Sequence, residues 1–237
     1  MSNVVSIFGE VDPREVPLYT VRQAARYLGD PASTVRAWTV GQDYPKAQGR
    51  TGRFKPLIAL PPGRPVRLTF NNLIEAYVLR TLRRAHQVEL STVRRAIANV
   101  TKQLGDRRPL LSRDFATDGV RIYLSTIEGM LEVSTGEGNQ YAIPKVIAIG
   151  LARIERSANG LAERLYPYRQ DVNEPKVVAI DPRTSFGRPT ISGSGVTVDV
   201  VADLIEAGEK TERVAREFGI TKEAVNSAVA WHRRATA

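Results

Sequence analysis

Apolar residues in the first part of the chain recur every three or four positions, which places them on one face of a helix. The first such run consists of Val21, Ala24, Ala25 and Leu28. Thr20 and Gln23 have the spacing of a capping box, and Gly29 is a typical helix stop. A turn and a second helix through about Val40 follow, so the pattern predicts helix, short turn, helix.

A stretch rich in Gly, Pro and basic residues follows at 41–56. We expect a tight turn at Thr51-Gly52, and therefore a short basic hairpin, which we call the wing. The Pro-rich segment 61–65 marks a boundary.

Two further helices are predicted, one starting at Asn72, which has capping-box spacing to Glu75, and one starting at Ser91. Their outer faces are basic. The residues concerned are Arg80, Arg83, Arg84, Arg94 and Arg95. These either bind phosphate or form a solvated helix face, and the sequence leaves both readings open.

The pattern changes between 110 and 170. Apolar and polar residues alternate loosely over 115–124 around Asp118-Gly119, which predicts a hairpin. Residues 140–143 are predicted to form a further strand. Pro144 is expected at the first position of a helix. Residues 153–168 read as two short strands joined at Asn159-Gly160.

The last part of the chain begins with a short apolar strand at 176–180 and a Gly-rich turn segment at 187–195. Three helical stretches are predicted after it. Their bounds are about 197–207, 211–218 and 221–234. Gly208 and Gly219 end the first two.

These elements predict a mainly α fold with small β elements (α+β). At 237 residues, the chain is long enough for two or three small domains. We expect an N-terminal arm, a winged helix-turn-helix with basic helices, a small α+β region, and a three-helix C-terminal domain with a second helix-turn-helix. Their predicted bounds are 1–18, 19–109, 110–170 and 176–235.

Two helix-turn-helix units are predicted from the spacing Ala-x3-Gly-x5-Val, which puts small residues where two helices cross and Gly at the turn. Its two copies are Ala25, Gly29 and Val35, and Ala215, Gly219 and Val225. About 0.3 matches are expected by chance from the composition. Trp38 and Trp231 each lie on the second helix of a copy, where we expect them to fill the core.

Charge separates the two copies. The net charge is +9, but residues 1–110 carry +10 and residues 111–237 carry −1. Such asymmetry points to a polyanion partner for the first half. The second helix of the second copy presents Lys222, Glu223 and Asn226. This set has no net positive charge, which disfavours binding to the phosphates of a DNA duplex. Whether it binds DNA, a protein partner or a second copy of the chain stays open.

The first copy is therefore the candidate DNA reader. Its second helix presents Ser33, Thr34 and Arg36 near its N-terminus, where recognition helices meet base edges. Further basic residues are expected to contact phosphates, which position a protein without specifying a sequence. They are Arg22, Arg50, Arg53 and Lys55.

The remaining chemistry is sparse. The chain has no Cys and two His 146 residues apart, which excludes disulfides and thiolate sites and argues against a metal centre. No nucleophile elbow, zinc-protease or phosphate-loop motif occurs, so we expect no catalytic residues, no cofactor and no enzyme. Without a long apolar run or a signal peptide, no membrane association is expected and the predicted compartment is the cytoplasm.

Two resemblances carry the functional prediction. The segment Tyr19-Thr-Val-x-x-Ala-Ala-x-Tyr-Leu-Gly29 with Ser33-Thr-Val-Arg-x-Trp38 resembles the opening of MerR-type winged helix-turn-helix regulators. The segment from Ile180-Asp-Pro through Gly187-Arg-Pro-Thr-Ile-Ser-Gly193 to Phe218-Gly-Ile-Thr221 resembles the domain-of-unknown-function 433 family. Here Ser192-Gly-Ser-Gly195 lacks the Arg that this family commonly has. The whole chain resembles the larger VapB-type antitoxins of type II toxin–antitoxin systems.

That resemblance implies a protein that binds its own promoter DNA as a repressor and neutralises a ribonuclease toxin of the PIN fold. A PIN active site is a cluster of metal-holding carboxylates, which an antitoxin Arg can enter. Arg188, Arg233 and Arg234 are the candidates. A homodimer is expected, because dimers match DNA half-sites one helical turn apart. The alternative is a stand-alone regulator without a toxin partner.

Overall fold

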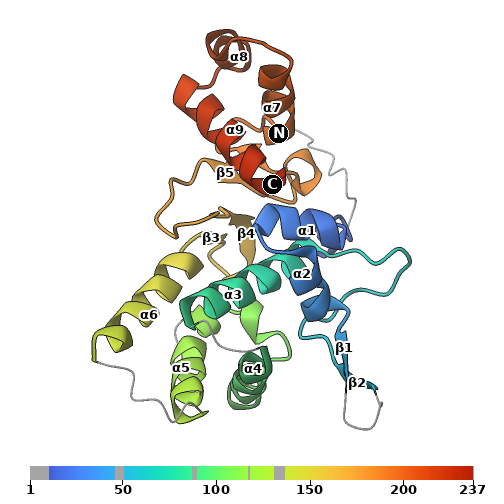
Figure 1. The fold of residues 1–237 in the computed structure, drawn as a ribbon, viewed down its shortest axis with the longest axis vertical. Coiled ribbons are helices and arrows are strands. Elements are labelled where there is room, and N and C mark those ends of the chain that lie inside the picture. Colours follow the sequence, from blue (N-terminus) through green and yellow to red (C-terminus); the bar gives the residue numbers. More distant parts are fainter. Residues whose placement is uncertain (1–10, 46–50, 87–89, 117, 131–136, 237) are drawn as a thin grey trace.

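The computed structural model describes residues 11–45, 51–86, 90–116, 118–130 and 137–236. Its helices and three antiparallel hairpins are shown in Figure 1. The helices are α1 (Val21–Leu28), α2 (Ala32–Thr39), α3 (Phe70–His86), α4 (Leu90–Leu104), α5 (Asp118–Met130), α6 (Glu137–Leu151), α7 (Val198–Glu206), α8 (Thr211–Phe218) and α9 (Lys222–Thr236). The strand pairs are β1 (Gln42–Pro45) with β2 (Thr51–Phe54), β3 (Ile154–Arg156) with β4 (Ala162–Leu165), and β5 (Val178–Ala179) with β6 (Thr190–Ile191). The predicted α+β class is confirmed.

The N-terminal helix pair forms as its sequence signals require. The Thr20 hydroxyl accepts a hydrogen bond from the Gln23 amide (3.1 Å), and the Gln23 side chain accepts one from the Thr20 amide (2.9 Å). This is the predicted capping box, which satisfies amides that have no partner inside the helix. Gly29 ends α1 with φ 70°, a left-handed conformation that other residues adopt only with strain.

Helix α3 is the centre of the fold, and it begins earlier than predicted. The Thr69 hydroxyl accepts from the Asn72 amide (3.1 Å), and the Asn72 side chain accepts from the Thr69 amide (3.2 Å). Thr69 therefore caps the helix and Asn72 occupies the third helical position. The prediction that Asn72 starts the helix was wrong, because Asn72 and Thr69 exchange the bonds expected of Asn72 and Glu75.

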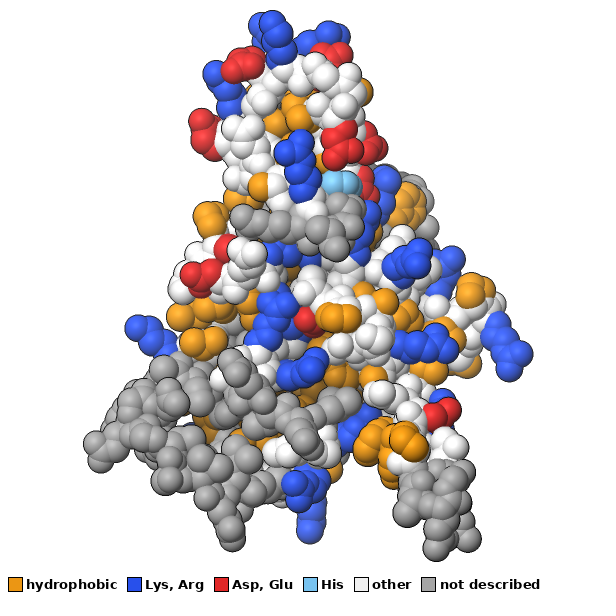
Figure 2. Space-filling view, in the orientation of Figure 1, with side chains coloured by type: hydrophobic (Ala, Val, Ile, Leu, Met, Phe, Trp, Pro, Cys, Tyr) orange, Lys and Arg blue, Asp and Glu red, His pale blue; other side chains and the backbone are white. Residues whose placement is uncertain are grey.

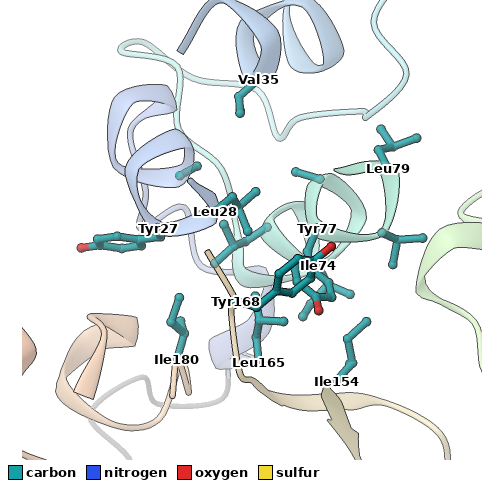
Figure 3. Packing of buried hydrophobic residues seen from close by; sticks show 14 of the residues in the cluster. Tyr27, Leu28, Val35, Ile74, Tyr77, Leu79, Ile154, Leu165, Tyr168 and Ile180 are labelled. Carbon is teal, nitrogen blue, oxygen red and sulfur yellow. The ribbon is translucent and has the colours of Figure 1, made fainter. Parts of the chain in front are cut away.

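Buried apolar residues from the whole described chain join in one cluster around α3. Figure 3 shows Ile74 and Tyr77 of α3 close to Tyr168, with Leu28 of α1 and Leu165 of β4 nearby. The Tyr77 and Tyr168 rings meet edge to face with centroids 6.0 Å apart. The Tyr77 hydroxyl donates to the Gly150 carbonyl of α6 (2.8 Å), so α3 and α6 are also joined by a polar contact.

The hairpin and strand predicted between 115 and 143 are wrong, because both segments are helical. Gly119, Tyr123 and Ile127 are buried at a spacing of four residues, which is the helical period rather than the alternating one. Asp118-Gly119 opens α5 instead of forming a hairpin turn. A Cβ at Gly119 would lie 2.7 Å from the Phe115 ring, so Gly is needed there for close packing. Pro144 lies inside α6 and not at its first position.

The other local predictions hold better. The hairpin joined at Asn159-Gly160 is confirmed, with Gly160 at φ 83°. The three C-terminal helices are confirmed within two residues of their predicted ends. Of the predicted N-terminal arm, residues 11–18 are described and include a short 3-10 helix at Pro13–Glu15. Within the described residues no helix is both long and apolar enough to cross a membrane.

Candidate nucleic-acid interface

The second helix of the N-terminal unit has one buried and one exposed face. Val35 and Trp38 are buried against the rest of the unit, as predicted for the motif Val and for the Trp. On the opposite face Ser33 and Arg36 are exposed, and Thr34 is half-buried at the edge of the buried face. We call Ser33, Thr34 and Arg36 the recognition face. The packing of the buried face therefore turns Ser33 and Arg36 outward.

The wing forms next to α2. Its strands pair in the register Gln42 with Phe54 and Tyr44 with Gly52. The Tyr44 and Phe54 rings stack with centroids 4.2 Å apart, which stiffens a hairpin of only two short strands. The predicted tight turn at Thr51-Gly52 is wrong, because both residues belong to β2. Arg50, one of the predicted phosphate contacts, lies at 46–50, outside the described residues.

A hollow of about 290 Å³ separates the recognition face from the wing. Ser33 and Arg36 line it from α2, and Asp43 and Arg53 line it from the wing. Arg53 donates to the Asp43 carboxylate (3.0 Å) and to the Val40 carbonyl (3.1 Å). The structure thus brings three of the predicted DNA-contacting residues to one place, although Arg53 already has an acidic neighbour.

The other predicted contacts lie nearby on the surface. Arg22 is exposed on α1, and Lys55 is exposed just after β2. In Figure 2, Lys and Arg side chains stand out on the side of the molecule that carries α1, α2 and the segment leading to α3. The top of the molecule, formed by α7, α8 and α9, instead mixes acidic and basic side chains.

Arg94 of α4 holds the wing against the body of the protein. Its guanidinium donates to the Lys55 carbonyl and lies 5.5 Å from the centroid of the Phe54 ring. Burial lowers the pKa of Arg94. This arginine was one of the candidate phosphate-binding residues, but its contacts place it under the wing instead.

Arg80 is likewise a structural residue, so both predictions for this arginine, phosphate binding and a solvated helix face, are wrong. It is 1% exposed and stacks on Tyr168, with its guanidinium carbon 4.0 Å from the ring centroid. It donates to the Tyr168 carbonyl (2.8 Å), and burial lowers its pKa. Arg84 binds the carbonyls of Gly29 (2.9 Å) and Arg169 (2.8 Å). Arg83 and Arg95 are exposed.

Sequence reasoning missed the joint between α1 and the C-terminal helices. Arg26 of α1 pairs with Asp199 of α7 (3.2 Å), and the same carboxylate lies 3.1 Å from the His232 ring nitrogen of α9. Arg169 donates to the Arg26 carbonyl (2.5 Å) and lies 3.7 Å over the Trp231 ring. These residues are up to 206 positions apart in the chain, so no local pattern signals the joint.

The candidate toxin-binding residues lie in separate elements. Arg188 is exposed before β6, and its Nε donates to the Ser185 carbonyl (3.3 Å). Arg233 is exposed near the end of α9, and the side chain of Arg234 lies outside the described residues. Within the described part of the chain, no three His, Cys, Asp or Glu side chains form a group suited to a metal ion.

The fold and this surface define a helix-turn-helix protein with a basic face, and comparisons with known proteins agree. A family model described as "Putative DNA-binding HTH domain" matches residues 17–97. A second model, "Protein of unknown function (DUF433)", matches residues 178–231 and confirms the resemblance predicted for the C-terminal segment.

Whole-chain relatives place the protein more closely. The chain is 31% identical to "Putative antitoxin VapB45" of Mycobacterium tuberculosis over 91% of this chain and 93% of that protein, and it belongs to the same family. It is also 26% identical to "Uncharacterized protein Rv2308" of that organism, over 91% of this chain and 89% of the relative. The crystal structure of Rv2018 from Mycobacterium tuberculosis matches with a TM-score of 0.69 and 28% identity, covering 90% and 98% of the two chains.

Proposed function

We propose that this protein is the antitoxin of a type II toxin–antitoxin module. In this proposal it binds the promoter of its own operon in the cytoplasm and neutralises a ribonuclease toxin of the PIN fold. Two findings support the two activities: the match of residues 17–97 to a DNA-binding helix-turn-helix model, and the family shared with a protein named as an antitoxin.

The observation that carries the DNA-binding part is the hollow between α2 and the wing. Arg36 is exposed on its α2 side and carries a planar fork of N–H donors that fits the two acceptors of guanine in the major groove. Ser33 and Thr34 flank it on the recognition face. Arg22, Arg53 and Lys55 would bind phosphates on either side, and Arg50 belongs to the same proposed set. No catalytic role is proposed for any residue.

The toxin-binding part rests on charge chemistry. A PIN ribonuclease holds its metal with carboxylates, so an arginine is a suitable side chain to block the site. Arg188 is exposed in a segment matched by the DUF433 model, and Arg233 is exposed on α9. Arg234 completes the proposed set. We further propose a homodimer, which would place two recognition faces on the two halves of a palindrome.

A test uses the full-length protein and a DNA fragment from upstream of its own gene. We expect nuclease protection of one palindromic stretch and tighter binding than to a shuffled fragment across a salt series. We also expect a small ribonuclease encoded in the same operon to co-purify after nuclease treatment. Its RNA cleavage should stop on addition of the wild-type antitoxin and resume with Arg188→Ala combined with Arg233→Ala.

The outcomes separate the two parts of the proposal. Promoter protection without any co-purifying protein would make the chain a stand-alone regulator. Equal affinity for promoter and shuffled DNA would reject sequence-specific reading, and toxin capture without promoter binding would reject autoregulation.

A further inference from the structure

A cavity lies between the chain segment that leads into β5 and the last helix, α9. Its volume is about 190 Å³, well above the ~10–15 Å³ that one water molecule needs. Arg169, Glu174 and Val178 line it on one side, and Ser227, Ala230 and Trp231 line it from α9. The lining therefore combines apolar walls, a flat indole and two charged side chains, as ligand sites do, and its volume, below the ~300–1,000 Å³ of drug-sized pockets, limits it to a small ligand.

Two of these side chains carry buried hydrogen-bond donors that lack an acceptor. Arg169 is 5% exposed and Trp231 is 7% exposed. Among the described residues, Nε and Nη2 of Arg169 and Nε1 of Trp231 have no hydrogen-bond partner. Buried polar groups are normally satisfied, so three unsatisfied donors on two neighbouring side chains call for an acceptor. Nε and Nη2 form one edge of the guanidinium, which is the geometry that binds a carboxylate with two parallel hydrogen bonds.

The charge around Arg169 favours an anion. Burial and the nearby Arg80 lower the pKa of Arg169 to about 9, and Arg26 and Arg84 act in the same direction. Glu174 opposes them, but its carboxylate already accepts from three backbone amides, those of Arg169 (2.9 Å), Gln170 (2.8 Å) and Asp171 (3.1 Å). Arg26 is paired with Asp199 (3.2 Å) and Arg84 with Asp30 (3.2 Å), so four arginines stand against three acids and the surroundings keep a net positive charge.

We propose that this cavity binds a small organic carboxylate with a flat apolar body. The Nε–Nη2 edge of Arg169 is buried beside the cavity, so the guanidinium turns toward the carboxylate and donates to it from this edge, and the apolar part lies against Trp231 and Val178. An acid is favoured over a neutral ligand because the free donors belong to a cation. This inference does not depend on the proposed function.

The position of the cavity gives its ligand a route to the DNA reader. The third nitrogen of Arg169, Nη1, donates to the Arg26 carbonyl near the end of α1. The guanidinium also lies against Gly29, the turn between α1 and α2, where a Cβ would come within 3.0 Å of Nη1. A carboxylate that reorients this guanidinium therefore acts directly on the turn of the helix-turn-helix.

The test uses nuclear magnetic resonance on the full-length, ¹⁵N-labelled protein. Trp38 and Trp231 are its two tryptophans, so two indole N–H signals are expected, and Trp38→Phe assigns them. Benzoate is the probe, and benzamide is the neutral control of the same shape. We expect benzoate to give a saturable shift of the Trp231 signal only, and benzamide to give none.

Two variants place the probe in the cavity. Ala230→Leu adds bulk to the wall of the cavity while leaving Arg169 and Trp231 unchanged, and we expect it to weaken benzoate binding at least about tenfold. Asn226→Leu, on the same helix but outside the lining, leaves benzoate binding unchanged. We expect Arg169→Met to abolish the benzoate-induced shift of the Trp231 signal. If Arg169→Met does not fold, Ala230→Leu alone decides the test.

Several results would overturn the proposal. They are the absence of a saturable shift at millimolar benzoate, an equal shift with benzamide, and a shift that Ala230→Leu leaves intact. The Trp231 signal could also stay unchanged with benzoate and shift when a co-purified protein binds. That result would assign the donors to an acidic side chain of that protein and reject the small-molecule site.

Discussion

The two helix-turn-helix units share a frame and differ in their surfaces. At an offset of 190 residues, α1 and α8 are both eight residues long and both end at a left-handed Gly, with φ 70° at Gly29 and 63° at Gly219. Val35 and Val225 are both fully buried. The Ala-x3-Gly-x5-Val spacing therefore encodes how two helices cross, and it says nothing about what they bind.

The exposed positions of the same frame carry opposite chemistry. Exposed side chains of the first unit at positions 22, 33 and 36 are Arg, Ser and Arg. Their counterparts at 212, 223 and 226 are Glu, Glu and Asn, all exposed. Lys222 is paired with Glu212 (3.1 Å). The first unit thus exposes two basic groups, Arg22 and Arg36, where the second exposes the acid Glu212 and the neutral amide Asn226.

The largest expected effect separates the two turns. Gly29→Ala places a Cβ about 3.0 Å from the Arg169 guanidinium, whereas Gly219→Ala meets nothing within 4 Å. Both variants bear the left-handed penalty of about 1–2 kcal/mol, and Gly29→Ala adds overpacking of about 1–3 kcal/mol. We expect unfolding free energies, measured in urea, to fall by about 2–5 kcal/mol for Gly29→Ala and about 1–2 kcal/mol for Gly219→Ala.

The control is Gly29→Ala in an Arg169→Ala background. There the penalty at Gly29 should shrink to that at Gly219, because the neighbour that the new methyl group crowds is gone. Equal losses at the two glycines in the wild-type background would contradict the packing argument.

The second prediction separates the two second helices as DNA readers. Arg36→Ala removes a fork of donors worth about 1–3 kcal/mol at one base pair, so affinity for promoter DNA should drop roughly 5- to 150-fold. Asn226→Ala, at the equivalent position, should leave it unchanged. Fluorescence anisotropy at fixed salt measures both. A larger loss for Asn226→Ala would move the reader to the C-terminal unit.

A third prediction concerns the helix starts. Thr20 closes a capping box on α1, whereas Lys210 precedes α8 without a side-chain cap. Thr20→Ala should therefore destabilise the protein by about 0.5–2 kcal/mol, and Lys210→Ser should stabilise it by about 1 kcal/mol. Urea titrations of both variants test this, with Thr211→Ala, inside the first turn of α8, as the control. A Lys210→Ser variant no more stable than wild type would show that water already caps α8.

The same contrast explains what the sequence predicted well. The signals that start and end the helices act through neighbours within four residues, as at Thr20, Gln23, Gly29 and Gly219. The structure confirms the helices that these residues begin or end. The recognition face followed from the same local pattern, because burying Val35 and Trp38 turns Ser33 and Arg36 outward. Whether these residues contact DNA stays a prediction.

Failures arose where distant contacts decide. Residues 118–127 pack against α4 on a four-residue period that a mixed apolar run does not distinguish from a hairpin. In sequence, Arg80 resembles a surface cation. In the fold, the ring and the carbonyl of Tyr168, 88 positions away, contact its guanidinium and compensate for the loss of water on burial. The joint of Arg26, Asp199 and Arg169 is built in the same way, so helical periodicity alone does not reveal it.

The smallest effect tests whether charge alone distinguishes the two units. Each phosphate neutralised by a cation contributes about 0.9 to the slope of log affinity against log salt concentration. Lys55 is exposed beside the wing, whereas Lys222 is paired with Glu212 on the C-terminal unit. We expect Lys55→Ala to lower the slope by about 0.9 and Lys222→Ala to leave it unchanged, as measured by anisotropy across a salt series.

Sequence preference provides the internal control for this prediction. Lys55→Ala should weaken promoter and shuffled DNA by the same factor, because a phosphate contact carries no base information. Arg36→Ala should weaken the promoter more than the shuffled fragment. If Lys55→Ala instead lowered preference without changing the slope, the wing would be reading base edges, and the division between a reading helix and a phosphate-binding wing would have to be reversed.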